Sequence, residues 1–210
     1  NGTTALDLGA STISGTLSAT SGAAAGIVDS GNVAVSGDVT LTTDANNGVI
    51  NLGTLQQSGG DLILTTNGTG DATVVNNAAI DLGASNVGGA LSATASAGTI
   101  TQNGGALTVA GTSAFTTSTA DQAITLSNTA NALTGAVSLT TSGTAGHVTI
   151  DNGTTALGVQ GTVSGDFALT SGEAIIDSAA LSVTGTTTVT TDMADKTITL
   201  DTLASTGAVL

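Results

Sequence analysis

Few residues of this sequence could take part in catalysis. The chain has one histidine, His147, one basic residue, Lys196, and no cysteine, tryptophan or tyrosine. His147 follows a glycine at the start of an expected strand, and no serine–aspartate or cysteine arrangement matches it, so we interpret it as a surface histidine. Glu173 stands alone, while Asp192 and Asp195 flank a turn. Sugar-cleaving enzymes need paired carboxylates on one face, so we predict no catalytic residue, no cofactor and no enzyme activity.

Calcium binding is the next chemistry to weigh. The turn 67–71, Asn-Gly-Thr-Gly-Asp, faintly resembles a calcium-binding turn. A calcium ion takes about six to eight oxygen ligands, and the glycine- and aspartate-rich nonapeptide of calcium β-rolls does not repeat here. We therefore interpret these turns as solvated and predict no metal site, with calcium at the Asp and Asn turns kept as the alternative.

Threonine is the residue with the most regular spacing. Eight segments share a pattern in which a turn residue is followed by apolar, polar, apolar and threonine, as in Gly89–Thr94. Such alternation predicts a strand with one buried face. The final threonine of each segment is expected to face outward, in a row made of Thr20, Thr42, Thr65, Thr94, Thr116, Thr140, Thr170 and Thr190.

Two interpretations of this threonine row are open. A flat Thr-x-Thr array on a β-solenoid is how several ice-binding proteins organise surface water. Threonine also has a high strand propensity and forms outward ladders on any exposed sheet. The outward position two residues earlier varies, being Ile63, Ala114 or Ala168 in three copies. We favour the purely structural interpretation.

The threonine-ended segments are arranged in a longer repeat. An inward position precedes each of the eight threonines, and these positions are Ala19, Leu41, Leu64, Ala93, Phe115, Leu139, Leu169 and Val189. Two short steps and one long step recur along this series, which gives a super-repeat roughly 74 to 76 positions long. Asp7–Ser11 is accordingly repeated as Asp81–Ser85. Super-repeats are expected at about 1–76, 77–151 and, incompletely, 152–210, and repeats of this kind predict a solenoid.

Each coil should hold about three strands. A second apolar segment follows every threonine-ended strand, a third follows in most coils, and no apolar period typical of a helix is present. We predict an all-β, right-handed parallel β-helix of eight or nine coils, about 40 Å long, with three coils to a super-repeat. Residues 83–88 and 158–163 are interpreted as insertions in the long coils. Residues 1–210 should form one solenoid segment of a longer repetitive chain.

Composition excludes several classes of protein. Hydrophobic residues make up 40% of the chain and alternate in register, which disfavours disorder. A net charge of −14 argues against nucleic acid and anionic membrane surfaces as partners. No apolar run approaches the ~20 residues of a membrane span, so we predict no membrane insertion. The single basic residue leaves one site for trypsin-like proteases, which suits a protein outside the cell.

The repeats resemble those of a known group of large bacterial exoproteins. Residues 98–117, followed by 123–128 and 133–139, are similar to repeats of filamentous-haemagglutinin-like adhesins and related autotransporter passengers. The resemblance covers the whole chain, although the secretion domain and binding tips of that family have no counterpart. It implies a secreted right-handed β-helix at the bacterial cell surface, serving as an adhesive or spacing stalk.

We therefore expect a structural extracellular rod, either a stalk or a filament module. Its expected partners are neighbouring coils of a longer chain or copies stacked head to tail, with a cell-surface or glycan ligand also considered. The alternative is a binding module, with either an ice-binding threonine face or an adhesin surface for glycans. A polysaccharide enzyme would need a groove lined by carboxylates.

Overall fold

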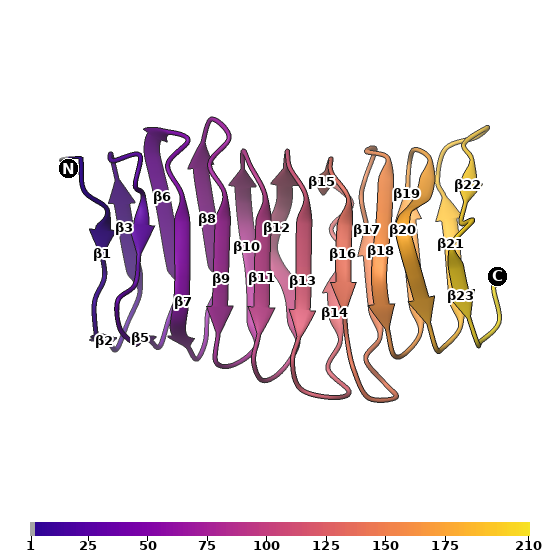
Figure 1. Cartoon of the computed structure of the whole chain (residues 1–210), viewed down its shortest axis with the longest axis horizontal. Helices are drawn as coiled ribbons and strands as arrows, with labels where there is room; N and C mark the ends of the chain where they lie inside the picture. The colour runs from indigo at the N-terminus through magenta and orange to yellow at the C-terminus, as the bar shows by residue number, and fades with distance from the viewer. Residues whose placement is uncertain (1–2) are drawn as a thin grey trace.

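The computed structural model describes residues 3–210 and shows a single elongated solenoid (Figure 1). The two ends of the chain lie at opposite ends of its long axis (Figure 1). Residues 3–210 contain strands, turns and bends and no helix. The predicted all-β solenoid is confirmed, with about nine turns.

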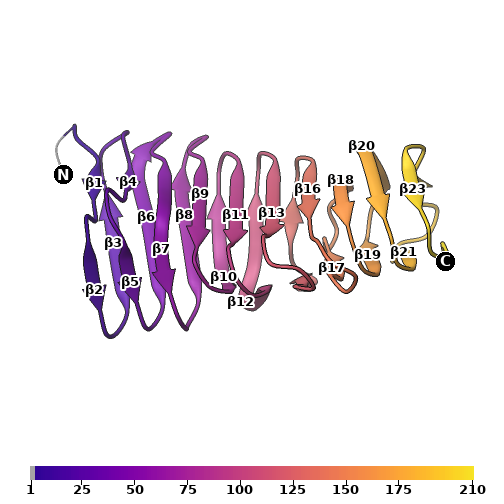
Figure 2. The same ribbon diagram turned by 60° about the horizontal axis from the view of Figure 1, so that its bottom comes forward.

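The strands form two parallel sheets that run the length of the solenoid (Figure 2). Sheet A contains β1 (Leu6–Asp7), β2 (Ser11–Ile13), β4 (Ile27–Val28), β5 (Val33–Val35), β7 (Ile50–Gln57), β9 (Ala72–Asn76), β11 (Leu91–Ala95), β13 (Ser113–Thr117), β16 (Val137–Thr140), β18 (Leu157–Val163), β20 (Ile175–Val183), β22 (Ile198–Thr199) and β23 (Leu203–Ser205). Sheet B contains β3 (Leu17–Ser21), β6 (Val39–Asn46), β8 (Leu62–Asn67), β10 (Ile80–Val87), β12 (Ile100–Val109), β14 (Ile124–Leu126), β15 (Ala132–Leu133), β17 (Val148–Asp151), β19 (Phe167–Ser171) and β21 (Thr187–Thr191).

Each turn crosses sheet A once and sheet B once. We call the part of a turn that lies on one sheet a span. A short span is a single strand such as β3, and a long span is either one long strand, such as β7, or two collinear ones, such as β4 and β5. Strand β6 counts as a short span, because it pairs with β3 in regular register only over 39–43 and its ladder to β8 shifts after Thr42. The predicted three strands per coil are therefore seen where a long span is broken in two. In β12 and β20 the second and third predicted strands are continuous, whereas the second strands β9 and β17 form short spans of their own.

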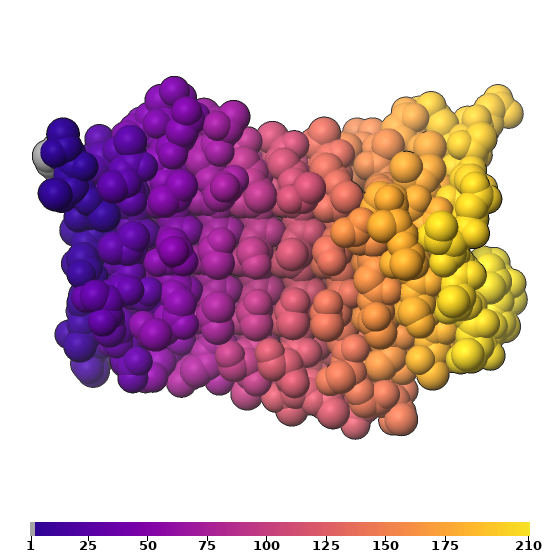
Figure 3. Space-filling view, viewed as in Figure 1, coloured from indigo at the N-terminus to yellow at the C-terminus, as the bar shows by residue number. Residues whose placement is uncertain are grey.

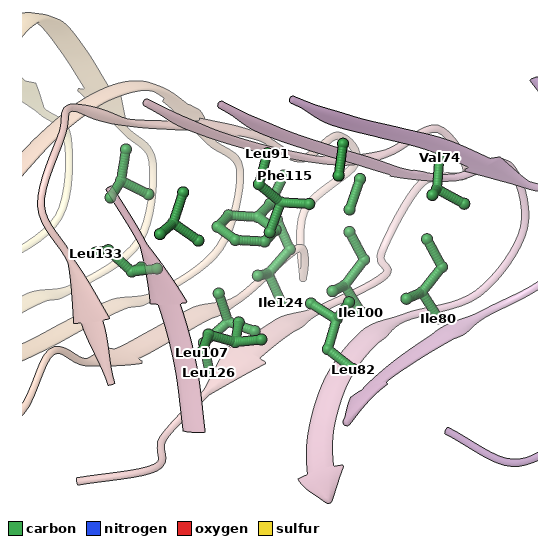
Figure 4. Packing of buried hydrophobic residues seen from close by; sticks show 14 of the residues in the cluster. Val74, Ile80, Leu82, Leu91, Ile100, Leu107, Phe115, Ile124, Leu126 and Leu133 are labelled. Atoms are coloured by element: carbon green, nitrogen blue, oxygen red, sulfur yellow. The ribbon is translucent and has the colours of Figure 1, made fainter. Parts of the chain in front are cut away.

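The core is a stack of aliphatic side chains between the sheets (Figure 4). One column joins Ile80, Ile100, Ile124 and Val148, which are paired in register on successive turns of sheet B. Phe115 is fully buried, and its neighbour Ala93 on the preceding turn is small. A large side chain is thus accommodated beside a small one, which keeps the interior close-packed.

The super-repeat contains three and a half turns, not the three that the sequence predicted. Its first copy consists of seven spans, which are β1–β2, β3, β4–β5, β6, β7, β8 and β9. Seven is odd, so the second copy begins with β10 on sheet B, whereas the first began with β1 on sheet A. The residues taken as insertions, 83–88 and 158–163, lie mostly within the long spans β10 and β18. Each long step is therefore a turn and a half.

As a result, the two sheets exchange roles twice along the axis. Long spans lie on sheet A up to β7, on sheet B from β10 to β15, and on sheet A again from β18. The exchanges occur where two short spans follow each other, at β8–β9 and at β16–β17. In the space-filling view, side chains of successive turns align in rows along the axis (Figure 3).

Residues with a positive φ close several of the turns. Asn47 and Asp121 adopt φ angles of 62° and 63°, and Gly60 adopts 76°. A Cβ atom added to Gly60 would lie 2.3 Å from the Oδ1 atom of Asp38 on the preceding turn. Glycine is needed there because of both the backbone conformation and the close approach of the next turn.

Candidate functional site

The threonines predicted as one outward row lie in three groups on two sheets. Successive partners are Thr20, Thr42 and Thr65 on sheet B, then Thr94, Thr116 and Thr140 on sheet A, then Thr170 and Thr190 on sheet B. All eight side chains are exposed or half-buried. The expectation of a single row is wrong, because each long step of the repeat adds half a turn and moves the next threonines to the other sheet.

The structure also adds threonines that the sequence pattern missed. Thr162 pairs with Thr140 and lengthens the row on sheet A to four. A further row on sheet B contains Thr101, Thr125 and Thr149. Its signal was an Ile-Thr or Val-Thr pair recurring at a constant step in the second strand of the coil. Among residues 3–210, no row exceeds four threonines, since on sheet A Val75 precedes Thr94 and Ser182 follows Thr162.

A second threonine often follows the outward one, and it points inward. Thr66 and Thr141 are buried, and their Oγ1 atoms donate to the carbonyl oxygens of Gly70 and Gly146 at 2.6 and 2.8 Å. Thr43 makes the equivalent bond to Gly48. These hydroxyls close the turns that follow the outward threonines of β6, β8 and β16, so the Thr-Thr pairs combine an outward and an inward role.

Two buried asparagines lie where the sheets exchange roles. Asn76 ends β9, Asn152 directly follows β17, and neither side chain is exposed to solvent. Both amides are fully hydrogen-bonded to backbone groups. The sequence pattern did not identify them, although the step from one to the other equals one super-repeat.

Aspartates link neighbouring turns. The Oδ1 atom of Asp121 accepts backbone N–H groups of Thr144 and Ala145 at 2.6 and 2.8 Å. These bonds, led by the one from Thr144, hold the pKa of the Asp121 carboxyl below its usual value. Asp29 bonds Gly53 and Thr54 of the next turn in the same way. These carboxylate oxygens thus accept backbone N–H groups of the next turn and help to hold successive turns together.

Asp61 is the one described carboxylate whose pKa is clearly raised. Burial is the main cause, followed by the negative charges of Asp81 and Asp38. Within residues 3–210, no group of three or more His, Cys, Asp or Glu side chains is placed to hold a metal ion. In the turn 67–71, which faintly resembles a calcium-binding turn, Asp71 accepts the N–H of Ala90, and the Nδ2 of Asn67 donates to the carbonyl of Asp44.

The residues weighed for catalysis are apart or engaged in surface contacts. His147 is exposed, and its Nδ1 atom accepts the backbone N–H of Asp166 at 2.9 Å. The two residues border an open depression of about 510 Å³ that also includes Thr149, Ala168 and Thr188. The Oε2 atom of Glu173 lies 2.8 Å from the Nζ of Lys196. Asp192 and Asp195 lie exposed in a turn. The Nδ1 atom of His147 also lies 3.6 Å from the Oδ2 atom of Asp166, so this depression holds one imidazole beside one carboxylate and not the two paired carboxylates sought in the sequence.

Within residues 3–210, no helix is long and apolar enough to cross a membrane.

Comparison with known proteins gives one family. The model described as "Repeats of unknown function (DUF5649)" matches residues 1–54, 69–140 and 145–209. No curated protein and no solved structure matches the chain.

Proposed function

The chain belongs to the DUF5649 family of repeats of unknown function, and from this premise we propose that it is a structural rod. The rod would be a stalk or filament module of a large bacterial surface exoprotein. One observation carries the proposal: parallel strand pairing continues from β1 to β22 on sheet A and from β3 to β21 on sheet B. Bending such a rod would disturb backbone hydrogen bonds on both sheets together.

Two features of the composition support a place outside the cell. A net charge of −14 with one basic residue keeps a long exposed surface soluble and leaves little for trypsin-like proteases to cut. The resemblance to filamentous-haemagglutinin-like repeats points to the same location. The test is accessibility on intact source cells: antibody labelling and loss of the chain on treatment with proteinase K support the proposal, and protection until lysis contradicts it.

The end faces suggest how the rod is extended. The core-facing Ile198 of β22 is 46% exposed, and Leu6 and Leu17 at the other end are only half-buried. Both ends carry a long span on sheet A, formed by β1–β2 at one end and β22–β23 at the other. We propose that further solenoid coils, including those of a second copy, pack head to tail with sheet A on sheet A.

Electron microscopy of the purified chain tests the stacking. Ten spans on sheet A at about 4.8 Å each give a repeat of about 48 Å along a stack. Filaments with this repeat support the head-to-tail contact. Isolated rods at all concentrations contradict stacking and leave the stalk function standing, whereas collapsed or flexible particles contradict the rod itself.

The alternative function, a binding module, predicts different experimental results. An ice-binding face should produce thermal hysteresis that disappears when Thr116 and Thr140, in the four-threonine row of sheet A, are replaced by bulky side chains. An adhesin surface should bind glycans in solution. Either result would replace the structural proposal, as would measurable turnover of a polysaccharide.

A further inference from the structure

The two exchanges between the sheets share one feature, a buried asparagine. Asn76 ends the extra short span β9, and Asn152 directly follows the extra short span β17. Each of these spans follows another short span, which is what moves the next long span to the opposite sheet. Because the same residue type occurs at the same place in two super-repeats, we expect Asn76 and Asn152 to have the same structural role.

At the first exchange, the amide of Asn76 takes the place of a missing strand. The long span β7 runs on to Gln57, but β9 ends beside Leu55 and the chain then crosses to sheet B. The Oδ1 atom of Asn76 accepts the N–H of Gln57 at 2.8 Å, and its Nδ2 atom donates to the carbonyl of the same residue at 3.0 Å. A further bond to the carbonyl of Ala79 fixes the crossing.

The second exchange repeats this arrangement with the sheets reversed. The Oδ1 atom of Asn152 accepts the N–H of Leu133 at 2.8 Å, and its Nδ2 atom donates to the carbonyl of Leu133 at 3.1 Å. Leu133 ends the last long span of sheet B. Bonds from Nδ2 to the carbonyls of Thr155 and Ala156 hold the crossing that follows.

A third buried asparagine provides a contrast. Asn131 lies within the long span formed by β14 and β15, where no exchange occurs. Its Oδ1 atom accepts the N–H of Leu107, but its Nδ2 atom donates to Gln102, Leu126 and Asp151, not to Leu107. Only at the exchanges, among these three buried asparagines, does one amide bond both backbone groups of one residue.

We infer that Asn76 and Asn152 are positioning residues that set the phase of the solenoid. Each satisfies the buried N–H and C=O groups left when a long span has no strand beside its end, which makes the half-turn step acceptable. Without the amide, Gln57 can be paired by a shift of the next long span, β10, to sheet A, where it would take the place of β9 beside β7.

This phase decides on which side of the rod a surface is displayed. The threonine row lies on sheet B before Asn76, on sheet A between the two asparagines, and on sheet B after Asn152. Any partner of that row would therefore meet it on opposite sides of the rod in successive super-repeats, about 17 Å apart along the axis at ~4.8 Å per turn.

Engineered cysteine pairs can report the phase, because the chain has no cysteine of its own. The pair T73C/S92C joins partners on β9 and β11 and reports the native exchange, and S18C/T40C joins β3 and β6 far from it. Partner strands on adjacent turns are close enough for a disulfide. The pair Q56C/N86C joins outward positions of the long spans β7 on sheet A and β10 on sheet B, which meet only if β10 takes the place of β9 beside β7 on sheet A.

The test is to place each pair in the full chain with N76L, with N76D and with the exposed-neighbour control N77L. We expect N76L to lower T73C/S92C cross-linking on the order of tenfold, to raise Q56C/N86C cross-linking and to leave S18C/T40C unchanged. N76D retains the acceptor oxygen and loses the donor, so it should give the same redistribution to a smaller extent. N77L should behave like the native chain.

Two results would overturn the inference. One is a native cross-linking pattern in both N76L and N76D. The other is a parallel fall of T73C/S92C and S18C/T40C in N76D without any Q56C/N86C product, because that pattern describes general destabilisation and no change of phase.

Discussion

The interior strand ends and the outer faces of the solenoid use the same polar residues for different purposes. Thr65 and Thr66 are neighbours in sequence, yet the first is half-exposed in an outward row and the second is buried with its hydroxyl on a turn carbonyl. Thr140 and Thr141 repeat the pair one super-repeat later. The inward polar groups hold the chain path, whereas the outward ones leave it nearly unaffected. The type of a polar residue alone therefore does not predict how much its side chain contributes to the stability of this molecule.

The largest difference between the regions should come from the phase-setting amides. The substitution N152A leaves the N–H and C=O of Leu133 and two further carbonyls without the Asn152 amide, which should lower the free energy of unfolding by about 3 kcal/mol or more. The exposed N77A should stay within about 0.5 kcal/mol. Urea unfolding followed by circular dichroism measures both variants. Equal losses of stability for N152A and N77A would contradict the distinction between interior and surface amides.

The next largest effects on stability should come from the Thr-Thr pairs, in which an inward and an outward threonine can be compared directly. T141V should cost about 1–3 kcal/mol, because its hydroxyl donates to Gly146 and accepts the N–H of Ser164. T66V should cost a similar amount, because the Thr66 hydroxyl donates to the carbonyl of Gly70 and accepts the N–H of Gly88. The outward T65V and T140V should change stability by less than about 0.5 kcal/mol. A cost for the outward variants as large as that for the inward ones would contradict the assignment.

Replacing two buried serines by alanine should change the stability in different directions. The Oγ atom of Ser113 is buried without a hydrogen-bond partner among the described residues, so S113A should leave stability unchanged or raise it by up to about 1 kcal/mol. The Oγ atom of Ser171 donates to the carbonyl of Thr155 and accepts the N–H of Glu173, so S171A should lower stability by about 1 kcal/mol. Thermal unfolding of both variants checks this, and a loss for S113A would indicate a partner that the described contacts do not contain.

The smallest effects should be those of the surface carboxylates, and they should differ in pH dependence. The lowered pKa of Asp121 means that its stabilising contribution is present above the unfolded-state pKa and is lost as the pH falls through the folded-state value. D121N should therefore flatten the acid limb of the stability curve. The raised pKa of Asp61 has the opposite sign, so D61N should be slightly more stable at neutral pH, and the gain should disappear in acid.

Stability measured from pH 2 to 8 distinguishes the two carboxylates. Asp121 is exposed and Asp61 is half-buried at the surface, so salt should weaken both effects. Shifts of the same sign for D121N and D61N would contradict the assigned causes.

Much of the fold could be predicted because each strand carries its own pattern. Alternating side chains in segments such as 89–94 identify an inward and an outward face locally, and glycine or asparagine marks the turns. The second strands containing Ile100 and Ile124 were placed correctly for the same reason. The candidate surface was predicted less well: the eight threonines do face outward, but they do not form one row.

The sequence by itself determined the class of fold, the strands and the length of the super-repeat, because alternation and spacing are local properties of the chain. Only the tertiary structure decided that one super-repeat makes seven spans, that the threonine rows alternate between sheets, and that Asn76 and Asn152 are interior residues. The physical reason is that a span of strand has the same local pattern on either sheet. Which sheet it joins depends on the backbone groups that the previous turn leaves unpaired.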